Sequence, residues 1–153
     1  FYLQQFLKKR KTVLGEVGIL RGTGLAIWSE LFPAGRIIGL DIDLGHINSN
    51  MSNLKKRGAF LNKNLELYEF DQFKNNSNLL ADILKGDKFD IFIDDGIHTE
   101  EAIIQTLVSV KPFLSEKFVY FVEDNKKVFM KLKETFPEYE VKDYGELTVV
   151  LPH

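Results

Sequence analysis

The chain of 153 residues contains no cysteine. Disulfide bonds, thiolate nucleophiles and zinc–thiolate sites are therefore excluded, and the absence fits a reducing compartment, so we expect a cytoplasmic protein. No apolar run is long enough to cross a bilayer. The first ten residues carry their basic side chains after the apolar ones, which is the reverse of a signal peptide. We therefore expect no membrane partner.

An excess of charge of either sign is also missing. Lys and Arg number 20 and Asp and Glu number 22, which gives a net charge of -2. Without a broad basic field, nucleic acid is not expected as a partner. The hydrophobic fraction of 44% and the length fit one globular domain with a sizeable core. We expect that domain to span 1–153 and to open with a helix over 1–11.

Two glycine motifs that bind phosphates are absent as well. The run Glu16-Val17-Gly18-Ile19-Leu20-Arg21-Gly22-Thr23-Gly24 follows the first expected strand, but it matches neither Gly-x-Gly-x-x-Gly nor a Walker loop. Gly18 would let the chain turn sharply, and Gly22 would let a ligand approach the backbone. A ligand without phosphate is the better match, with Glu16 accepting a cationic or hydrogen-bond-donating group. An ordinary strand-to-helix loop is the alternative.

The chain does contain a regular alternation of strand-like and helix-like stretches. Strands are expected at 12–18, 36–43, 65–71, 89–94 and 118–122, and helices at 23–32, 45–57, 76–85, after Thr99 and at 127–136. The last two expected strands, 139–143 and 146–151, are separated by Tyr144-Gly145, which is typical of a hairpin. This order predicts an α/β fold: a Rossmann-like, doubly wound, mostly parallel seven-stranded sheet with an antiparallel C-terminal hairpin.

Acidic residues follow two of the most apolar strands. The strand at 89–94 runs into Asp94-Asp95-Gly96-Ile97-His98, and the strand at 118–122 runs into Glu123-Asp124-Asn125. In open α/β sheets the ligand lies beyond the carboxyl ends of the strands. Carboxylates gathered there indicate a site for a hard cation, with a histidine beside it. The alternatives are a helix-entry role for His98 and, for the second run, an acidic helix N-terminus favoured by the helix dipole.

The second and third strands also end in polar residues. Asp41 closes the second strand, about twenty residues after the glycine turn, where a carboxylate accepts hydrogen bonds from ribose hydroxyls. The third strand ends in Asp71-Gln72. Either side chain could bind an adenine edge, and a turn role fits equally well.

The chain thus combines candidate residues for a ribose and an adenine with an antiparallel final hairpin, and it lacks a phosphate loop. In this combination it resembles the class I S-adenosylmethionine-dependent methyltransferases. Within that class the chain is most similar to the macrolide-sugar O-methyltransferases and the related cephalosporin hydroxylase-type methyltransferases. Their pattern is E-x-G-x-x-x-G-x-S, G-x-D, D-D-G-S-H and Y-x-x-E-D. The corresponding runs here are 16–24, 39–41, 94–98 and 120–124, and the resemblance covers about 12–151.

The resemblance implies an O-methyltransferase that uses S-adenosylmethionine and Mg²⁺ and acts on a hydroxyl of a sugar or similar small-molecule acceptor. Carried over by position, His98 would be the catalytic base, and Asp95, Glu123 and Asp124 would be the metal ligands. Asp94 would replace Asp95 as the ligand if the register were shifted by one. The residues expected to bind the cofactor are Glu16, Gly18, Gly22, Asp41, Asp71 and Asp94.

Some positions depart from the family pattern. The two glycines usual before the fifth strand are absent from 113–118, and Ile97 stands where the family has serine. Family members also carry extra segments that cover the acceptor, which here only 1–11 or a partner subunit of a homo-oligomer would supply. Two other classes therefore stay open. One is a non-catalytic or partner-dependent S-adenosylmethionine-binding domain. The other is a nicotinamide-dependent oxidoreductase, against which the missing dinucleotide motif argues.

Overall fold

The computed structural model describes residues 9–153, so the helix expected over 1–11 lies almost wholly outside the described part. The chain divides into two compact units, 1–70 and 71–153, which are described separately below. The expectation of a single domain over 1–153 stays a prediction.

The first unit is a three-stranded parallel sheet with two connecting helices. Its elements are β1 (Val13–Val17), α2 (Thr23–Leu31), β2 (Arg36–Asp41), α3 (Gly45–Lys56) and β3 (Leu65–Glu69). The strand order is β3-β2-β1, and Val17 of β1 lies beside Leu40 of β2. The side chains of Leu14, Ile37 and Leu40 are fully buried. Apolar residues run through β1 and β2 because parallel strands are covered on both faces.

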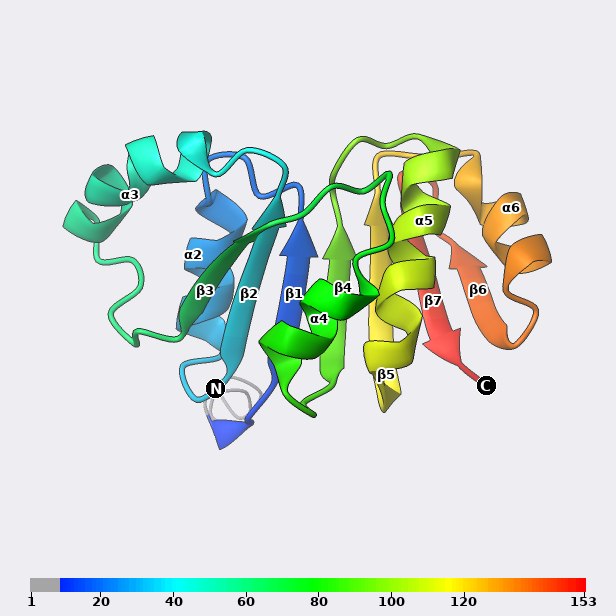
Figure 1. The fold of residues 1–153 in the computed structure, drawn as a ribbon, viewed down its shortest axis with the longest axis horizontal. Coiled ribbons are helices and arrows are strands. Elements are labelled where there is room, and N and C mark those ends of the chain that lie inside the picture. Colours follow the sequence, from blue (N-terminus) through cyan, green and yellow to red (C-terminus); the bar gives the residue numbers. More distant parts are fainter. Residues whose placement is uncertain (1–8) are drawn as a thin grey trace. The chain divides into compact units, whose positions relative to one another are not determined.

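The second unit holds four strands and ends in the hairpin. Its elements are α4 (Ser77–Leu84), β4 (Phe89–Asp94), α5 (Glu100–Val110), a 3₁₀ turn (Lys111–Phe113), β5 (Leu114–Glu123), α6 (Val128–Thr135), β6 (Tyr139–Asp143) and β7 (Leu147–Pro152). The order is β4-β5-β7-β6, with β4 and β5 parallel and both pairs that include β7 antiparallel. Helices α4 and α5 lie over one face of β4 and β5 (Figure 1).

The strands belong to a mostly parallel seven-stranded sheet with an antiparallel C-terminal pair, so the predicted Rossmann-like α/β fold is confirmed. Strand β5 is longer than predicted, because it begins at Leu114 rather than Phe118. Leu114 pairs with Phe89, and the register between the strands shifts between Phe89 and Ile91. The prediction followed the apolar run alone, whereas the strand also includes the polar residues Ser115, Glu116 and Lys117, which lie where the register with β4 is irregular.

The core of the second unit is aromatic. The rings of Phe92 and Tyr120 stack with centroids 5.2 Å apart, and Phe89 meets Phe92 edge-on at 5.1 Å. Helix α5 contributes Ile103 and Leu107, whose side chains are fully buried. These contacts give β4 and β5 a rigid base beneath their carboxyl ends.

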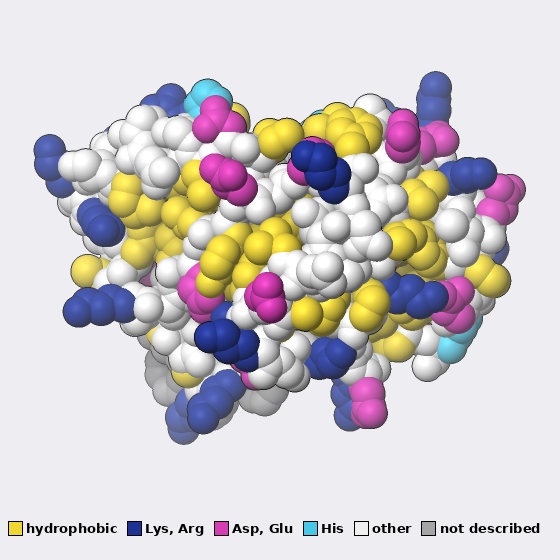
Figure 2. Space-filling model, in the orientation of Figure 1, with side chains coloured by type: hydrophobic (Ala, Val, Ile, Leu, Met, Phe, Trp, Pro, Cys, Tyr) yellow, Lys and Arg dark blue, Asp and Glu magenta, His cyan; other side chains and the backbone are white. Residues whose placement is uncertain are grey.

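The surface matches the balanced composition. On the face shown in Figure 2, basic and acidic side chains are interspersed rather than gathered by sign. Among the described residues, no helix combines the length and the apolar character needed to span a membrane.

Candidate functional site

Two loops lie at the same edge of the second unit, after β4 and after β5. The strands are parallel, so their carboxyl ends are neighbours (Figure 1). Two contacts connect the loops. Asn125 Nδ2 donates a hydrogen bond to the carbonyl oxygen of His98 at 2.8 Å, and His98 Nδ1 lies 3.3 Å from the carbonyl oxygen of Glu123. The acidic strand ends are therefore held together, as expected from the sequence.

The two loops bring the predicted metal and base residues close together. One side-chain ligand atom from each of Asp95, His98 and Asp124 lies within 4.8 Å of the others. We call these three residues the strand-end cluster. Asp95 and His98 are half-buried and Asp124 is exposed. Asp95, rather than Asp94, is the residue of the β4 end that belongs to it.

Glu123 borders the strand-end cluster, and the charged groups of the cluster affect its pKa. Burial, followed by the charges of Asp95 and Asp124, raises the pKa of Glu123, while His98 lowers it. Burial also raises the pKa of Asp95, with His98 opposing and Asp124 adding to the rise. Carboxylates crowded in a partly buried place disfavour their own ionisation unless a positive charge is present. Several oxygen donors of this kind fit a hard divalent cation.

The backbone of the cluster is strained at two positions. His98 has φ 58° and Asp124 has φ 56°, in the left-handed region that residues other than glycine rarely adopt. Each such residue costs on the order of 1 kcal/mol and persists only where its surroundings hold it. Both strained residues belong to the strand-end cluster, a pattern found at ligand-binding and catalytic sites.

The contact at Nδ1 decides the tautomer of His98. The carbonyl oxygen of Glu123 can only accept a hydrogen bond, so Nδ1 carries the proton in this contact. Nε2 then keeps its lone pair, which can take up a proton or bind a cation. The ring is therefore oriented by the backbone of the neighbouring loop.

Asp94 has a different environment from its neighbour Asp95. Its carboxylate accepts hydrogen bonds from Gln72 Nε2 at 2.8 Å and from the Tyr120 hydroxyl at 3.1 Å. Its side chain is 1% exposed, and burial raises its pKa to about 6 even though these hydrogen bonds lower it. A contact between Asp94 and a cofactor stays a prediction.

The glycine turn of the first unit has the conformation expected of it. Gly18 and Gly22 have φ 87° and 78°. A Cβ on Gly22 would lie 2.5 Å from Ile47 Cδ1, so space as well as conformation requires glycine there. The turn is joined to the end of β2, because the N–H of Leu20 donates to Asp41 Oδ2 at 3.1 Å. Asp41, which is predicted to bind the ribose, therefore borders the glycine turn.

Glu16 lies beneath the first turn of α2. Its side chain is 6% exposed, and Trp28 Nε1 donates to Glu16 Oε2 at 2.6 Å. A Cβ on Gly24 would lie 2.7 Å from Glu16 Oε1, which shows how closely the carboxylate approaches the helix. Binding of a cofactor by Glu16, Gly18, Gly22 and Asp41 stays a prediction.

The two candidates at the end of β3 separate in the structure. Asp71 is paired with Lys74 at 2.9 Å, and this hydrogen bond, with one from the N–H of Phe73, lowers the pKa of Asp71. Gln72 is 4% exposed and makes its hydrogen bonds to residues inside the second unit. Asp71 therefore stays the candidate for an adenine edge, and Gln72 has a role that sequence reasoning missed.

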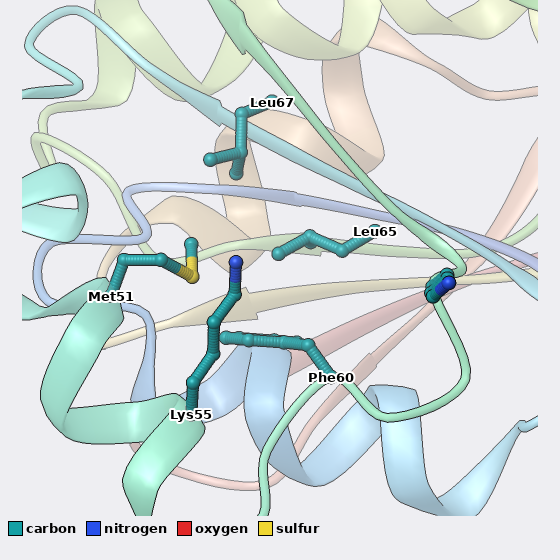
Figure 3. Close-up of a pocket in the computed structure, with 6 residues that line it drawn as sticks. Met51, Lys55, Phe60, Leu65 and Leu67 are labelled. Carbon is teal, nitrogen blue, oxygen red and sulfur yellow. The ribbon is translucent and has the colours of Figure 1, made fainter.

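The first unit also contains a cavity of about 400 Å³ between α3 and β3. It is lined by Met51, Lys55, Phe60, Lys63, Leu65 and Leu67. Figure 3 shows Lys55 extending its amino group between Met51 and Leu65. No residue of the predicted site lines this cavity, so it is separate from the candidate site.

No family model and no curated protein sequence matches the chain, whereas solved structures match its fold. MycE methyltransferase from the mycinamycin biosynthetic pathway, in complex with Mg, SAH and mycinamycin VI, has a TM-score of 0.70 and 19% identity. The match covers 99% of this chain and 47% of MycE. The O-methyltransferase TomG from Streptomyces achromogenes, in complex with SAM, has a TM-score of 0.69 and 14% identity over 99% of this chain and 78% of TomG.

A third match is the fibrillarin/Nop5p complex, with a TM-score of 0.63 and 16% identity over 98% of this chain and 78% of the other. At these identities the likeness concerns the fold. The chain has the fold of the S-adenosylmethionine-dependent methyltransferases, which confirms the resemblance inferred from its motifs at that level. It spans about half the length of MycE.

Proposed function

We propose that this chain is an S-adenosylmethionine-dependent O-methyltransferase domain that uses Mg²⁺ and methylates a hydroxyl of a small molecule, such as a sugar. The observation that carries the proposal is the strand-end cluster of Asp95, His98 and Asp124 on a methyltransferase fold. Fold alone does not determine function, whereas a strained cluster of carboxylates with an oriented imidazole is a specific chemical feature.

The cofactor part rests on the strand ends and on the matched structures. MycE and TomG were solved with SAH or SAM. In this chain we assign cofactor binding to Glu16, Gly18, Gly22, Asp41, Asp71 and Asp94. S-adenosylmethionine supplies a methyl group on a sulfonium, so the protein must mainly align that group with the attacking oxygen and exclude competing water.

The metal part rests on the oxygen donors around the cluster. Asp95, Glu123 and Asp124 would hold Mg²⁺, which suits oxygen ligands and keeps positions open for water or substrate. The raised pKa values of Asp95 and Glu123 support this assignment, because a bound cation offsets the repulsion among the carboxylates. The ion supplies positive charge that makes a nearby hydroxyl more acidic.

His98 is the proposed base. Its Nε2 takes the proton from the acceptor hydroxyl, while the Nδ1–H contact with the Glu123 carbonyl holds the ring and stabilises the charged imidazolium. The same nitrogen cannot take the proton while it binds a cation. His98 is near enough to Asp95 and Asp124 for either role, so an experiment must separate them.

The second candidate is a non-catalytic or partner-dependent S-adenosylmethionine-binding domain. The observation that favours it is the departure from the family pattern at Ile97, which stands where the family has serine. A homo-oligomer, in which a partner subunit would cover the acceptor, is part of the same candidate. A nicotinamide-dependent oxidoreductase fits less well, because the glycine turn lacks the dinucleotide pattern.

Calorimetry with S-adenosylhomocysteine, with and without Mg²⁺, tests the proposal. We expect micromolar binding, followed by transfer of a labelled methyl group from S-adenosylmethionine to members of a panel of sugars and diols. Asp41→Asn is expected to weaken binding, because it removes the carboxylate assigned to the ribose. Absence of binding at millimolar ligand would defeat the proposal. Binding without transfer to any acceptor would favour the second candidate.

A further inference from the structure

Gln72 makes hydrogen bonds to the loop that carries Asp95 and His98 and to the elements beside it. Its side chain is 4% exposed. Nε2 donates hydrogen bonds to Asp94 Oδ1 at 2.8 Å and to Thr106 Oγ1 at 2.9 Å. Oε1 accepts a hydrogen bond from the N–H of Ile97 at 2.9 Å. Both hydrogens of the carboxamide and its oxygen are therefore used within the second unit.

The partners fix the orientation of this carboxamide. The N–H of Ile97 can only donate, so it must face Oε1. The hydroxyl of Thr106 gives its own hydrogen to the carbonyl oxygen of Ala102 at 2.8 Å, so its oxygen is free to accept from Nε2. Exchanging the nitrogen and oxygen of Gln72 would oppose donor to donor at Ile97. The side chain thus has a single orientation that satisfies all its neighbours.

Gly96 makes room for Gln72. A Cβ at position 96 would lie 1.9 Å from Gln72 Oε1 and 2.6 Å from its Cδ. Gly96 is not among the residues with positive φ, so its backbone conformation is open to other residues. Glycine is needed here for space, because the carboxamide lies directly against the backbone between Asp95 and Ile97.

The hydrogen bond to Ile97 acts at the centre of the loop. The Ile97 N–H lies two residues after Asp95 and one residue before His98, whose backbone is left-handed. Asn125 holds the carbonyl oxygen of His98 from the neighbouring loop at 2.8 Å. The strained residue is therefore held by hydrogen bonds on both sides, and Gln72 supplies the one that precedes it.

We propose that Gln72 is a positioning residue that fixes the separation of the Asp95 carboxylate and the His98 imidazole. It contacts neither side chain, and it acts through the backbone between them. The expected effect of Gln72 on metal affinity rests on the proposed function. Its expected effect on the His98 imidazole does not, because it concerns the protein without ligands and can be tested separately.

The first experiment compares Gln72→Met with Gln105→Met. Both changes replace an amide by a thioether of similar length, and Gln105 lies on α5 outside this network. Mn²⁺ binding is followed by electron paramagnetic resonance. Because residues that orient metal ligands contribute on the order of 10- to 100-fold to affinity, we expect a loss of that size for Gln72→Met and no loss for Gln105→Met.

The second readout is the imidazole of His98 without metal. Long-range ¹H–¹⁵N spectra distinguish the two neutral tautomers, and His98→Gln identifies the signals. We expect a protonated Nδ1 in the wild type and in Gln105→Met, and a mixture of tautomers in Gln72→Met. A side chain that served only the stability of the core would leave this signature unchanged.

A double-mutant cycle with Gly96→Ala covers the case in which Gln72→Met does not fold. Alone, Gly96→Ala should displace the carboxamide and lower both the stability and the Mn²⁺ affinity. In a Gln72→Ala background the new methyl group finds space, so its effect should be several-fold smaller. Thr106→Val, which removes one acceptor and keeps Gln72, should give an intermediate loss of affinity.

The outcomes separate the two proposals. Wild-type protein that binds neither Mn²⁺ nor S-adenosylhomocysteine would defeat the proposed function, while the His98 spectra and the cycle would still test the positioning role. Gln72→Met with wild-type Mn²⁺ affinity and unaltered His98 signals would overturn the positioning role and leave the proposed function standing. Strictly additive effects in the cycle would also overturn it.

Discussion

At the scale of single residues, Asp94 gives a prediction about pH and stability. Burial raises its pKa from 3.8 to about 6 in the folded protein. Between these values the folded state holds a proton that the unfolded state has lost, so stability falls as the pH rises through this range. The gap between the two pKa values corresponds to about 3 kcal/mol. Asp94→Asn has no proton to lose at this position. Its free energy of unfolding, relative to that of the wild type, should therefore rise by about this amount between pH 4 and pH 7.

Urea unfolding at several pH values, with a chelator present, measures this difference. The comparison with Asp94→Asn cancels the contributions of other titrating groups, including Asp95 and Glu123. Glu69→Gln, which replaces an exposed carboxylate at the end of β3, is the matched control for removal of a carboxylate. A constant difference between wild type and Asp94→Asn across the range would contradict a raised pKa.

The role of His98 can be decided by two measurements on one variant. If Nε2 is the base, His98→Gln should lower turnover by about 10²- to 10⁴-fold, because that is the usual contribution of a general base, and it should leave S-adenosylhomocysteine binding unchanged. If Nε2 is a ligand, Mn²⁺ affinity should fall together with turnover. Retained turnover would remove His98 from the mechanism.

The residues of the strand-end cluster could be predicted from the sequence, and Gln72 could not. Asp95, His98 and Asp124 follow apolar strands directly, and the parallel arrangement of β4 and β5 brings such positions to one edge. The role of Gln72 depends on partners 22 to 34 residues away, which local patterns do not identify. Its position after a strand fitted a ligand or a turn equally well.

At the scale of elements, the Asn125 side chain makes hydrogen bonds both to the start of α6 and to the loop after β4. Its Oδ1 accepts hydrogen bonds from the N–H groups of Lys127 and Val128 at the start of α6, at 2.9 and 3.0 Å. Its Nδ2 holds the carbonyl oxygen of His98. Asn125→Asp keeps the acceptor and loses the donor, whereas Asn125→Ala loses both.

We expect Asn125→Ala to lower the free energy of unfolding by about 1 kcal/mol, the usual net contribution of a hydrogen bond, and Asn125→Asp to lower it less. Both variants should perturb the His98 signals, because both release its carbonyl oxygen. Chemical denaturation and the ¹H–¹⁵N spectra check the two effects separately. Equal losses of stability in the two variants would show that the acceptor oxygen contributes little to α6.

The element boundaries show where local signals are sufficient. Strand β4 and the start of α5 after Thr99 were predicted correctly. An apolar run ends at Asp94, and Thr99 Oγ1 accepts a hydrogen bond from the N–H of Ala102 at 3.3 Å. The start of β5 was wrong, because Ser115, Glu116 and Lys117 lie in the strand without an apolar pattern. Apolar periodicity reports burial, so it does not identify exposed strand residues that lie at an irregularity in the pairing.

At the scale of the whole molecule, the alternation of strands and helices was enough to predict the fold, and the acceptor cannot be predicted in the same way. The fold is shared with structures of MycE, of TomG and of the fibrillarin/Nop5p complex, which come from different pathways or assemblies. Under the proposed function, the acceptor would be recognised by loops, which vary among proteins that share a fold.

Ligand-linked stability tests cofactor binding for the chain as a whole. A ligand that binds only the folded state adds about 2.7 kcal/mol to the free energy of unfolding at a concentration of about 100 times its Kd. S-adenosylhomocysteine should therefore shift the urea midpoint upward, and adenosine, which lacks the amino-acid part, should shift it less. Asp41→Asn should reduce both shifts, since the ribose is common to the two ligands. A midpoint that neither ligand moves would mean that the chain keeps a methyltransferase fold without its cofactor, and its strand-end cluster would then need a different ligand.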